Sequence, residues 1–226
     1  MERRYAVPYN WLEPAFSMRW AGKQGMANIV LAWIRPGMNL LDIGCGDGWY
    51  AARYVQAGAV VSGIDVSARS VGFASLLVPS GHFLVGSATV LPYPNASFDV
   101  VTCLQVLEHL TDAEGAQALT AFRRVVRPGG KIIISVPSTR RRLSAAHLRH
   151  YTPKLLRETL APYGTVEEIV GQERHHPVSL GLRKLFENRF WRLPKAAEWF
   201  YTKVYFPRWN RAPLTHANNL VCLLRV

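Results

Sequence analysis

Apolar residues recur along this chain in short runs that alternate with stretches of helical spacing. The short runs, of about four to eight residues and bounded by Gly, Pro or Asp, are typical of buried strands. They fall at 39–44, 59–64, 82–86, 98–103, 131–136, 164–170 and 220–226. Helical patterns fill intervals between them, at 47–56, 67–78, 111–126 and from 152 onward. Strands that alternate with helices predict a parallel sheet covered on both faces.

Three of the predicted helices begin with residues that favour a helix start. Ser67 is placed to cap the helix over 67–78. Thr111 and Glu114 form the capping-box pattern, and Thr152 is followed by Pro153 at the first helical position. These signals fix the expected helix starts more closely than hydrophobic spacing alone does.

The first strand ends in a glycine-rich loop, LLDIGCGDG, with Gly44, Gly46 and Gly48 spaced two apart. Glycine lets backbone pass close to a ligand where a side chain would collide. The spacing is not the dinucleotide fingerprint, because Trp49 stands where that motif needs its third glycine, and no Gly-Lys-Ser/Thr marks a phosphate loop. The loop fits a nucleoside that bears an amino-acid tail, with Asp42 beside it to receive an ammonium group.

The second predicted strand ends in an acid, Asp65, about twenty residues beyond the glycines. An acid at this place can accept hydrogen bonds from both hydroxyls of a ribose. The glycine loop and Asp65 together predict an adenosine-type ligand at the carboxyl ends of parallel strands.

From about Leu40 to Pro137, the chain resembles the class I S-adenosylmethionine-dependent methyltransferases. The resemblance is strongest to the small bacterial type that includes ubiquinone and menaquinone biosynthesis methyltransferases. It rests on LLDIGCGDG, GIDVS (63–67), LPYPNASFDVVTCLQVLEHL (91–110) and RVVRPGGKIIISVP (124–137). It implies a Rossmann-like α/β fold with a seven-stranded sheet of order 3-2-1-4-5-7-6, the last strand antiparallel, and helices on both faces.

The same resemblance implies S-adenosyl-L-methionine as cofactor and S-adenosyl-L-homocysteine as product. The implied cofactor-binding residues are Asp42, Gly44, Cys45, Gly46, Gly48, Asp65, Val66, Ser87, Ala88 and Gln105. Asp42 either contacts the methionine ammonium or braces the loop, and Cys45 is expected to pack in it. Ser87 departs from the family, because relatives place an Asp there for the adenine amino group. A hydroxyl can accept the same hydrogen bond without the charge, or the Ala88 backbone replaces it.

His109 and His147 are the candidate catalytic residues, as general bases near neutral pH. The alternative for His109 is support of its loop, and for His147 packing at the start of the next helix. No covalent nucleophile and no metal are implied. The run Arg140 to Arg142 is either a solvated loop or a group of cations that gathers phosphate or carboxylate.

At 226 residues the chain fits a single methyltransferase domain over 1–226, with an N-terminal helical cap over 1–38. Its three cysteines lie far apart, which argues against a disulfide framework or a zinc site. Residues 174–215 stand out as an insertion with nine aromatic residues, nine Lys or Arg and two acids. This insertion is expected to be a helical lid on the substrate pocket, a membrane-facing surface, or simply core or a dimer contact.

A net charge of +12 favours an anionic partner, although simple solubility explains it equally well. No apolar run reaches the ~18 residues of a spanning helix and no signal peptide is evident, so a cytoplasmic location is expected, with peripheral contact to an anionic membrane surface. The sequence therefore predicts a methyltransferase that acts by direct in-line transfer on a small or lipid-like, anionic acceptor. The alternatives are a nucleic-acid-associated methyltransferase or binder, which is the less favoured partner class, and a non-catalytic regulatory subunit that binds the cofactor.

Overall fold

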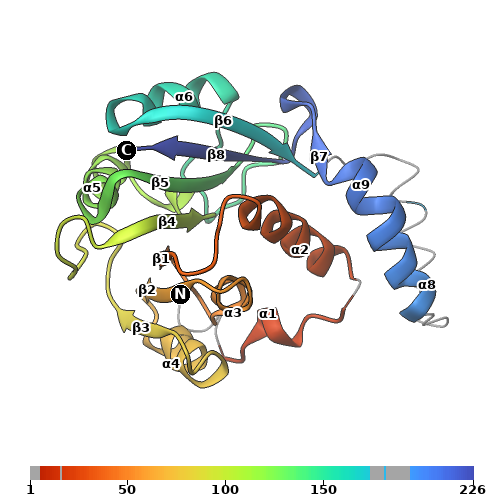
Figure 1. The fold of residues 1–226 in the computed structure, drawn as a ribbon. Helices are drawn as coiled ribbons and strands as arrows, with labels where there is room; N and C mark the ends of the chain where they lie inside the picture. Colours follow the sequence, from red (N-terminus) through yellow and green to blue (C-terminus); the bar gives the residue numbers. More distant parts are fainter. Residues whose placement is uncertain (1–5, 16, 174–180, 182–193) are drawn as a thin grey trace.

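The fold is an α/β arrangement around one mixed sheet of eight strands, seen here in a computed structural model (Figure 1). The structure describes residues 6–15, 17–173, 181 and 194–226. The sheet order is β3-β2-β1-β4-β5-β8-β6-β7. The strands are β1 (Asn39–Ile43), β2 (Val60–Asp65), β3 (His82–Val85), β4 (Phe98–Leu104), β5 (Val126–Pro137), β6 (Thr165–Gln172), β7 (Arg211–Ala212) and β8 (Asn219–Arg225). Strands β1 to β5 run parallel, and β8 is antiparallel to both β5 and β6.

Helices cover both faces of the sheet, as the alternation of elements predicts. They are α1 (Tyr9–Leu12), α2 (Met18–Leu31), α3 (Trp49–Gln56), α4 (Ala68–Leu77), α5 (Asp112–Val125), α6 (Pro153–Leu160), α8 (Pro194–Trp199) and α9 (Phe206–Trp209), with short turns η2 (Leu107–His109), η3 (Ala161–Tyr163) and η5 (Leu214–His216). Successive strand residues point to opposite faces. Leu40 thus packs in a buried cluster with α2 and α3, and Leu41 in a second cluster with α5 and α6.

The expected helix caps are confirmed. The Ser67 hydroxyl accepts a hydrogen bond from the Ser70 N–H at 3.3 Å, and that of Thr152 accepts one from the Leu155 N–H at 3.1 Å. Both halves of the capping box between Thr111 and Glu114 are present. Each bond satisfies a backbone N–H that the first helical turn leaves without an intrahelical partner.

Two expectations about the sheet need correction. The sheet has eight strands rather than seven, because the two-residue β7 pairs with the end of β6 at the edge. The order of the other seven strands is as expected, with β8 in the place of the last strand. Strand β5 also begins at Val126, five residues before the expected start at Lys131. Val126 already pairs with Phe98, and the irregularity that follows in this pairing lets the Pro-Gly-Gly stretch continue the strand.

Residues 194–209 of the 174–215 insertion form a helical rod that lies beside α2 (Figure 1). It runs from α8 through a π-helical turn, η4 (Phe200–Tyr205), into α9. Pro207 follows that turn and has no N–H to donate, which favours the wider helical spacing. Phe200, Tyr201 and Tyr205 are buried in one cluster with Ala21 of α2. Much of the insertion's aromatic content here is therefore core, while residues 174–180 and 182–193 lie outside the described residues.

The N-terminal region expected to be helical over 1–38 contains α1 and α2, with residues 1–5 and 16 outside the described ones. Among the described helices, none combines the length and apolar character that crossing a membrane requires.

Candidate functional site

The glycine loop lies where the carboxyl ends of β1 and β2 meet. Gly44, Gly46 and Gly48 have φ angles of +70°, +55° and +78°, which favour glycine over residues with a side chain. The backbone N–H groups of Gly44 and Cys45 donate to the carbonyl of Ile64 at 2.8 and 3.1 Å. The loop is therefore tied to the end of β2 before any ligand binds.

The three glycines have different reasons to lack a side chain. A Cβ on Gly48 would lie 3.1 Å from Ala74, so this glycine permits α3 and α4 to pack closely. A Cβ on Gly44 would lie 2.5 Å from Cγ2 of Val106. A Cβ on Gly46 would meet nothing within 4 Å. Only Gly46 therefore leaves space that protein atoms do not fill, as a loop that lies against a ligand requires.

Asp65 stands at the end of β2 and is largely buried. Its Oδ2 accepts a hydrogen bond from the Gly46 N–H at 3.0 Å, and its Oδ1 accepts one from the Ser67 N–H at 2.9 Å. Each carboxylate oxygen has a further lone pair and can also accept from a hydroxyl. The next residue, Val66, is 58 % exposed and places an apolar side chain beside this acid. The predicted ribose role of Asp65 fits this geometry and stays a prediction.

Asp42 lies in β1, two residues before the first glycine of the loop, and is buried with one of its two carboxylate oxygens unsatisfied. The Thr102 hydroxyl donates to Oδ1 at 2.7 Å, whereas Oδ2 has no hydrogen-bond partner among the described residues. Burial raises the pKa of Asp42 from 3.8 to about 7, with a smaller contribution from the negative charge of Asp65, while the Thr102 hydrogen bond lowers it. A buried, unpaired carboxylate oxygen is costly unless a cation or donor reaches it. The residues present therefore fit a ligand with an ammonium group.

The other residues predicted to bind the nucleoside, Cys45, Ser87 and Ala88, give weaker structural support for that role. Cys45 is buried, and burial raises the pKa of its thiol well above the usual value, consistent with the packing role expected for it. The Ser87 hydroxyl accepts from the Thr89 N–H at 3.2 Å and shares a hydrogen bond with the Thr89 hydroxyl at 2.8 Å. Ala88 packs against the core cluster of α5 and α6. An adenine contact by Ser87 or Ala88 stays a prediction.

Gln105, directly after β4, has a backbone conformation that non-glycine residues rarely adopt, with φ of +58°. Its N–H donates to the Ser135 carbonyl at 2.9 Å, and its side-chain amide donates to the Ser135 hydroxyl at 3.2 Å. These two bonds to β5 hold the strained residue in place. Strain of this kind is concentrated at functional sites, which supports the interest in Gln105 that the sequence raised.

The sequence interpretation missed Asp47, which joins the glycine loop to the N-terminal segment. The Asn10 backbone N–H and side-chain amide donate to the two oxygens of Asp47, both at 2.9 Å. The Trp11 indole N–H donates to the Asp47 carbonyl at 2.8 Å, and the Lys23 ammonium to the Asn10 carbonyl at 2.9 Å. Helix α1 is therefore tied to the loop through Asp47, and its role as a cap on the cofactor stays a prediction. No local pattern links Asn10 to Asp47, which lie 37 residues apart.

A cavity of about 840 Å³ opens beside the loop. It is lined by Arg19, Gly22, Lys23 and Met26 of α2, by Tyr50 and Gln105, by Arg140, Arg141 and Arg142, and by Glu173, His216, Asn218 and Asn219. The volume falls in the usual range for small-molecule sites. The arginine run was singled out from the sequence. The lining residues of α2 and those at or just before the start of β8 (His216, Asn218 and Asn219) were not predicted, because only the fold brings these distant segments together.

His109 and His147, the predicted general bases, lie together but do not line this cavity in the described part of the chain. Their ring centroids are 4.9 Å apart. Nδ1 of His109 lies 2.7 Å from the Ala146 carbonyl, and Nδ1 of His150 lies 3.1 Å from the Arg141 carbonyl. Because a carbonyl only accepts, both Nδ1 atoms carry the proton. His147 Nδ1 then donates to His150 Nε2 at 2.8 Å, and Nε2 of His109 is the proton acceptor in a neutral His109 ring.

Glu108 lies against the two histidines and is fully buried, with both carboxylate oxygens lacking a hydrogen bond among the described residues. Burial raises its pKa from 4.5 to about 7. Ligand atoms of Glu108, His109 and His147 all lie within 4.8 Å of one another, and these residue types also bind metal ions. The expectation that no metal is needed therefore stays a prediction.

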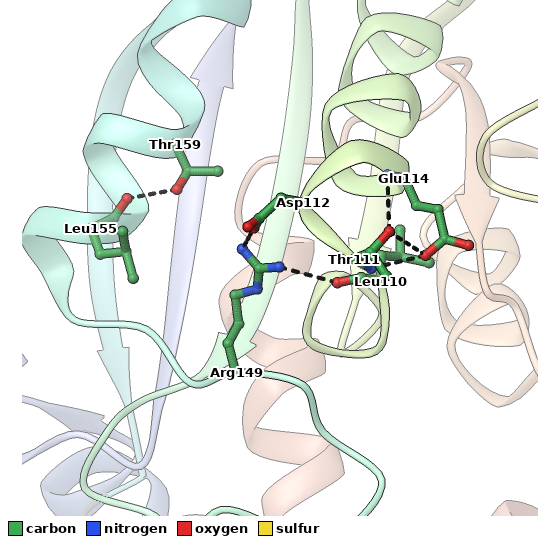
Figure 2. Close-up of polar contacts among 7 residues, drawn as sticks. All are labelled: Leu110, Thr111, Asp112, Glu114, Arg149, Leu155 and Thr159. Atoms are coloured by element: carbon green, nitrogen blue, oxygen red, sulfur yellow. Dashed lines mark hydrogen bonds and ion pairs between the residues drawn. The ribbon is translucent and has the colours of Figure 1, made fainter.

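Arg149 holds the segment with His147 and His150 against the start of α5 (Figure 2). Its guanidinium pairs with Asp112 and donates to the Leu110 carbonyl at 3.4 Å. The start of α5 is itself fixed by the hydrogen bonds between Thr111 and Glu114. The segment that carries His147 is thus anchored to the start of α5 through Arg149.

Comparison with known proteins finds a family model that matches the part of the chain carrying the glycine loop. Residues 41–134 match the model of the family described as "Methyltransferase domain". Over these residues the chain is similar to a methyltransferase domain, in agreement with the resemblance to the class I S-adenosylmethionine-dependent methyltransferases that the sequence motifs indicate. The match includes the glycine loop, Asp65 and Gln105, but neither α2 nor Arg140 to Arg142.

Curated relatives are similar to this chain over about the same stretch or a somewhat longer one. The ubiquinone biosynthesis O-methyltransferase of Aromatoleum aromaticum is 40% identical over 104 residues, which cover 44% of each chain. That of an Azoarcus species is 38% identical over 140 residues, 57% of this chain and 58% of the relative. The chain thus matches only about half the length of such relatives. The PH0226 protein of Pyrococcus horikoshii shares the fold, with a TM-score of 0.66 at 16% identity over 100% of this chain and 98% of that one.

Proposed function

We propose that this protein transfers a methyl group from S-adenosylmethionine to an acceptor bound in the cavity beside Gln105, as one methyltransferase domain over residues 1–226. One observation carries the proposal. A Cβ on Gly46 would meet open space, and the Gly46 N–H is held by Asp65, while the buried Asp42 at the end of β1 has a carboxylate oxygen without a partner among the described residues. These features support a loop that lies against a ligand with two acids nearby in sequence and fold, and they lie within the segment that matches the methyltransferase family.

Each residue around the loop is proposed to bind a different part of S-adenosylmethionine. Backbone of Gly44, Cys45 and Gly46 lies against the ligand, and Asp42 accepts its ammonium group. Asp65 accepts from the ribose hydroxyls, and the exposed side chain of Val66 covers one face of the base. Ser87 or the backbone of Ala88 accepts from the adenine edge. Helix α1, held by Asp47, closes over the loop and excludes water.

When bound, S-adenosylmethionine supplies a methyl group already activated by its sulfonium. The protein then has to hold the acceptor atom in line with that methyl group, and this positioning alone supplies on the order of 7 to 11 kcal/mol in favourable cases. Gln105 is suited to positioning because Ser135 fixes both its backbone and its amide. His109 or His147 accepts the proton of an acceptor hydroxyl or acidic carbon. Because neither ring lines the cavity, the proton reaches it through a bridging water or after the Arg140 to Arg142 segment moves aside.

The acceptor is proposed to be small or lipid-like. The cavity volume of about 840 Å³ is sufficient for a compact molecule or the head group of a larger one. Relatives named for ubiquinone biosynthesis are consistent with a lipid-linked acceptor in the cytoplasm or at an inner membrane surface. In the described part of the insertion, packing of Phe200 and Tyr201 on α2 favours a role as a support for the cavity wall.

The proposal is tested by incubating the protein with S-adenosylmethionine labelled in the methyl group and with fractionated cell extract. Labelled product in a small-molecule or lipid fraction, with release of S-adenosylhomocysteine, is the expected result. Label only in nucleic acid would favour the nucleic-acid alternative. Micromolar binding of the cofactor in calorimetry without transfer to any fraction would favour a regulatory subunit and contradict an enzymatic role.

A further inference from the structure

The walls of the large cavity carry an unusual excess of positive charge. Among the residues that the structure describes, five cationic side chains line it, Arg19, Lys23, Arg140, Arg141 and Arg142, against one carboxylate, Glu173. They come from two segments more than a hundred residues apart, α2 and the loop after β5. Such convergence on one concave site raises the local concentration of anions.

The contacts of these cations show which are available to a ligand. The Arg141 guanidinium donates to the side-chain carbonyl of Asn219 at 3.0 Å, and the Lys23 ammonium donates to Asn10. Within the described residues, the Arg140 guanidinium donates to the Thr215 carbonyl alone, at a long 3.4 Å. Arg142 makes no hydrogen bond or ion pair among residues 6–15, 17–173 and 194–226. Arg141 and Lys23 thus belong to the framework, whereas Arg140 and Arg142 are exposed cations at the cavity wall.

Resting on the proposed function, we infer that the acceptor bears a phosphate or diphosphate group, held in this cavity chiefly by Arg140 and Arg142. Arg19 is paired with Glu13 at 3.6 Å. Arg140 and Arg142, by contrast, have no carboxylate partner among the described residues, so their charges stay uncompensated. A phosphoryl group brings about two negative charges and several acceptor oxygens, which the guanidinium fork matches in geometry. Neutral polar groups of Gln105, Asn218 and Asn219 on the same wall leave room for an uncharged remainder of the acceptor.

The position of the cavity beside Gln105 explains how a bound phosphate group would help the reaction. Gln105 lines the cavity and also follows β4 at the sheet edge where the glycine loop lies. A phosphate fixed by the arginines would anchor the acceptor while its reacting atom lies near Gln105. Anchoring through a group remote from the chemistry is a general means of orienting a substrate.

The test is calorimetry on the full chain saturated with S-adenosylhomocysteine, with inorganic pyrophosphate as the titrant. The double variant Arg140→Ala/Arg142→Ala is expected to bind pyrophosphate at least about tenfold more weakly than the unmodified protein, since hydrogen bonds to charged groups are lost. The control variant Arg69→Ala/Arg123→Ala removes the same charge from exposed sites on α4 and α5 outside the cavity. It should change the pyrophosphate affinity less than about twofold.

Two further titrants define the chemistry and the source of the anion. Phthalate should bind more weakly than pyrophosphate, and tighter binding of this dicarboxylate would overturn the inference. Vesicles of phosphatidylglycerol compare a lipid-borne phosphate with a free one. Binding of pyrophosphate alone supports a soluble acceptor, and binding of both supports a lipid-linked acceptor, provided that each is weakened by the Arg140/Arg142 variant.

Absence of pyrophosphate binding, or equal weakening in the control variant, would also overturn the inference. These failures are separable from failure of the proposed function, because S-adenosylhomocysteine affinity is measured first on the same samples. A protein that binds the nucleoside but not pyrophosphate contradicts only the phosphate site. A protein that does not bind the nucleoside contradicts the methyltransferase proposal itself.

Discussion

The backbone N–H of Gly46 donates a hydrogen bond of 3.0 Å to Oδ2 of Asp65, across 19 residues of sequence. The acid that is predicted to bind the ribose therefore also fixes the glycine that is predicted to face the cofactor. The two sequence motifs form one unit, and a change at either should affect the same binding event.

Replacement of Asp65 by Ala is expected to weaken binding of S-adenosylhomocysteine by at least about a hundredfold. Charge-assisted hydrogen bonds contribute ~1.5 to 3 kcal/mol each, and both ribose bonds and the support of Gly46 are lost. Calorimetry measures the affinity. Asp99→Asn serves as the control, because Asp99 pairs with Arg127 beyond the cofactor loop and should leave affinity unchanged. An unaltered affinity in the Asp65 variant would remove the assigned role.

Cofactor affinity should depend on pH through Asp42. Its pKa of about 7 means that the carboxyl is mostly protonated below pH 7, through burial first and the charge of Asp65 second. It must lose its proton to receive an ammonium group, so affinity should rise between pH 5 and 7, by up to about tenfold per pH unit. The variant Asp42→Asn should bind more weakly and show a flat profile over this range. A wild-type profile that is equally flat would exclude contact between Asp42 and the ammonium.

The stability of the fold should fall as pH rises because of Glu108. The folded protein holds this carboxyl protonated, with a pKa of about 7, whereas the unfolded chain ionises it near 4.5. The folded state thus binds the extra proton between these values, and the stability that this proton provides is present below pH 4.5 and lost by about pH 7. Glu108→Gln should remove this part of the pH dependence and be more stable than the parent at pH 8. Urea denaturation at several pH values measures it, with exposed Glu158→Gln as control.

Helix α1 should slow release of the cofactor. Asn10→Ala removes a side-chain hydrogen bond to buried Asp47, at a cost of about 1 kcal/mol, and loosens the segment over the loop. Stopped-flow dissociation of S-adenosylhomocysteine should be several times faster than in the parent. The exposed Asn28→Ala on α2 removes a comparable amide contact elsewhere and should not alter the rate. Equal rates in both variants would show that α1 does not cover the site.

Much of the fold could be predicted because its signals are local. Alternation of apolar runs located seven of the eight strands, and Thr111 and Glu114 marked the start of α5. The two-residue β7 has no such pattern, since its pairing with Gly171 and Gln172 depends on the path of the insertion. Strand β5 was placed too short because Pro-Gly-Gly signals a turn in isolation, while pairing with Val226 and its neighbours continues the strand.

Only those candidate site residues that belong to a local sequence motif could be predicted. Glycine spacing and the acids at strand ends identified the loop, Asp42 and Asp65. The partnership of Asn10 with Asp47 and the approach of Arg19 and Lys23 to Arg140 depend on tertiary packing, which no spacing rule conveys. His109 and His147 were selected separately, and the fold places their rings 4.9 Å apart.

The central claim, that space beside Gly46 receives the cofactor, is tested most directly by comparing Gly46→Ala with Gly37→Ala. Both glycines have positive φ, +55° and +81°, and a Cβ at either meets no protein atom within 4 Å. Backbone strain of roughly 1 to 2 kcal/mol should therefore lower the stability of both variants to a similar degree. In calorimetry with S-adenosylmethionine, Gly46→Ala should lose binding by at least about a hundredfold while Gly37→Ala binds like the parent. Equal affinity in the two variants would contradict the account.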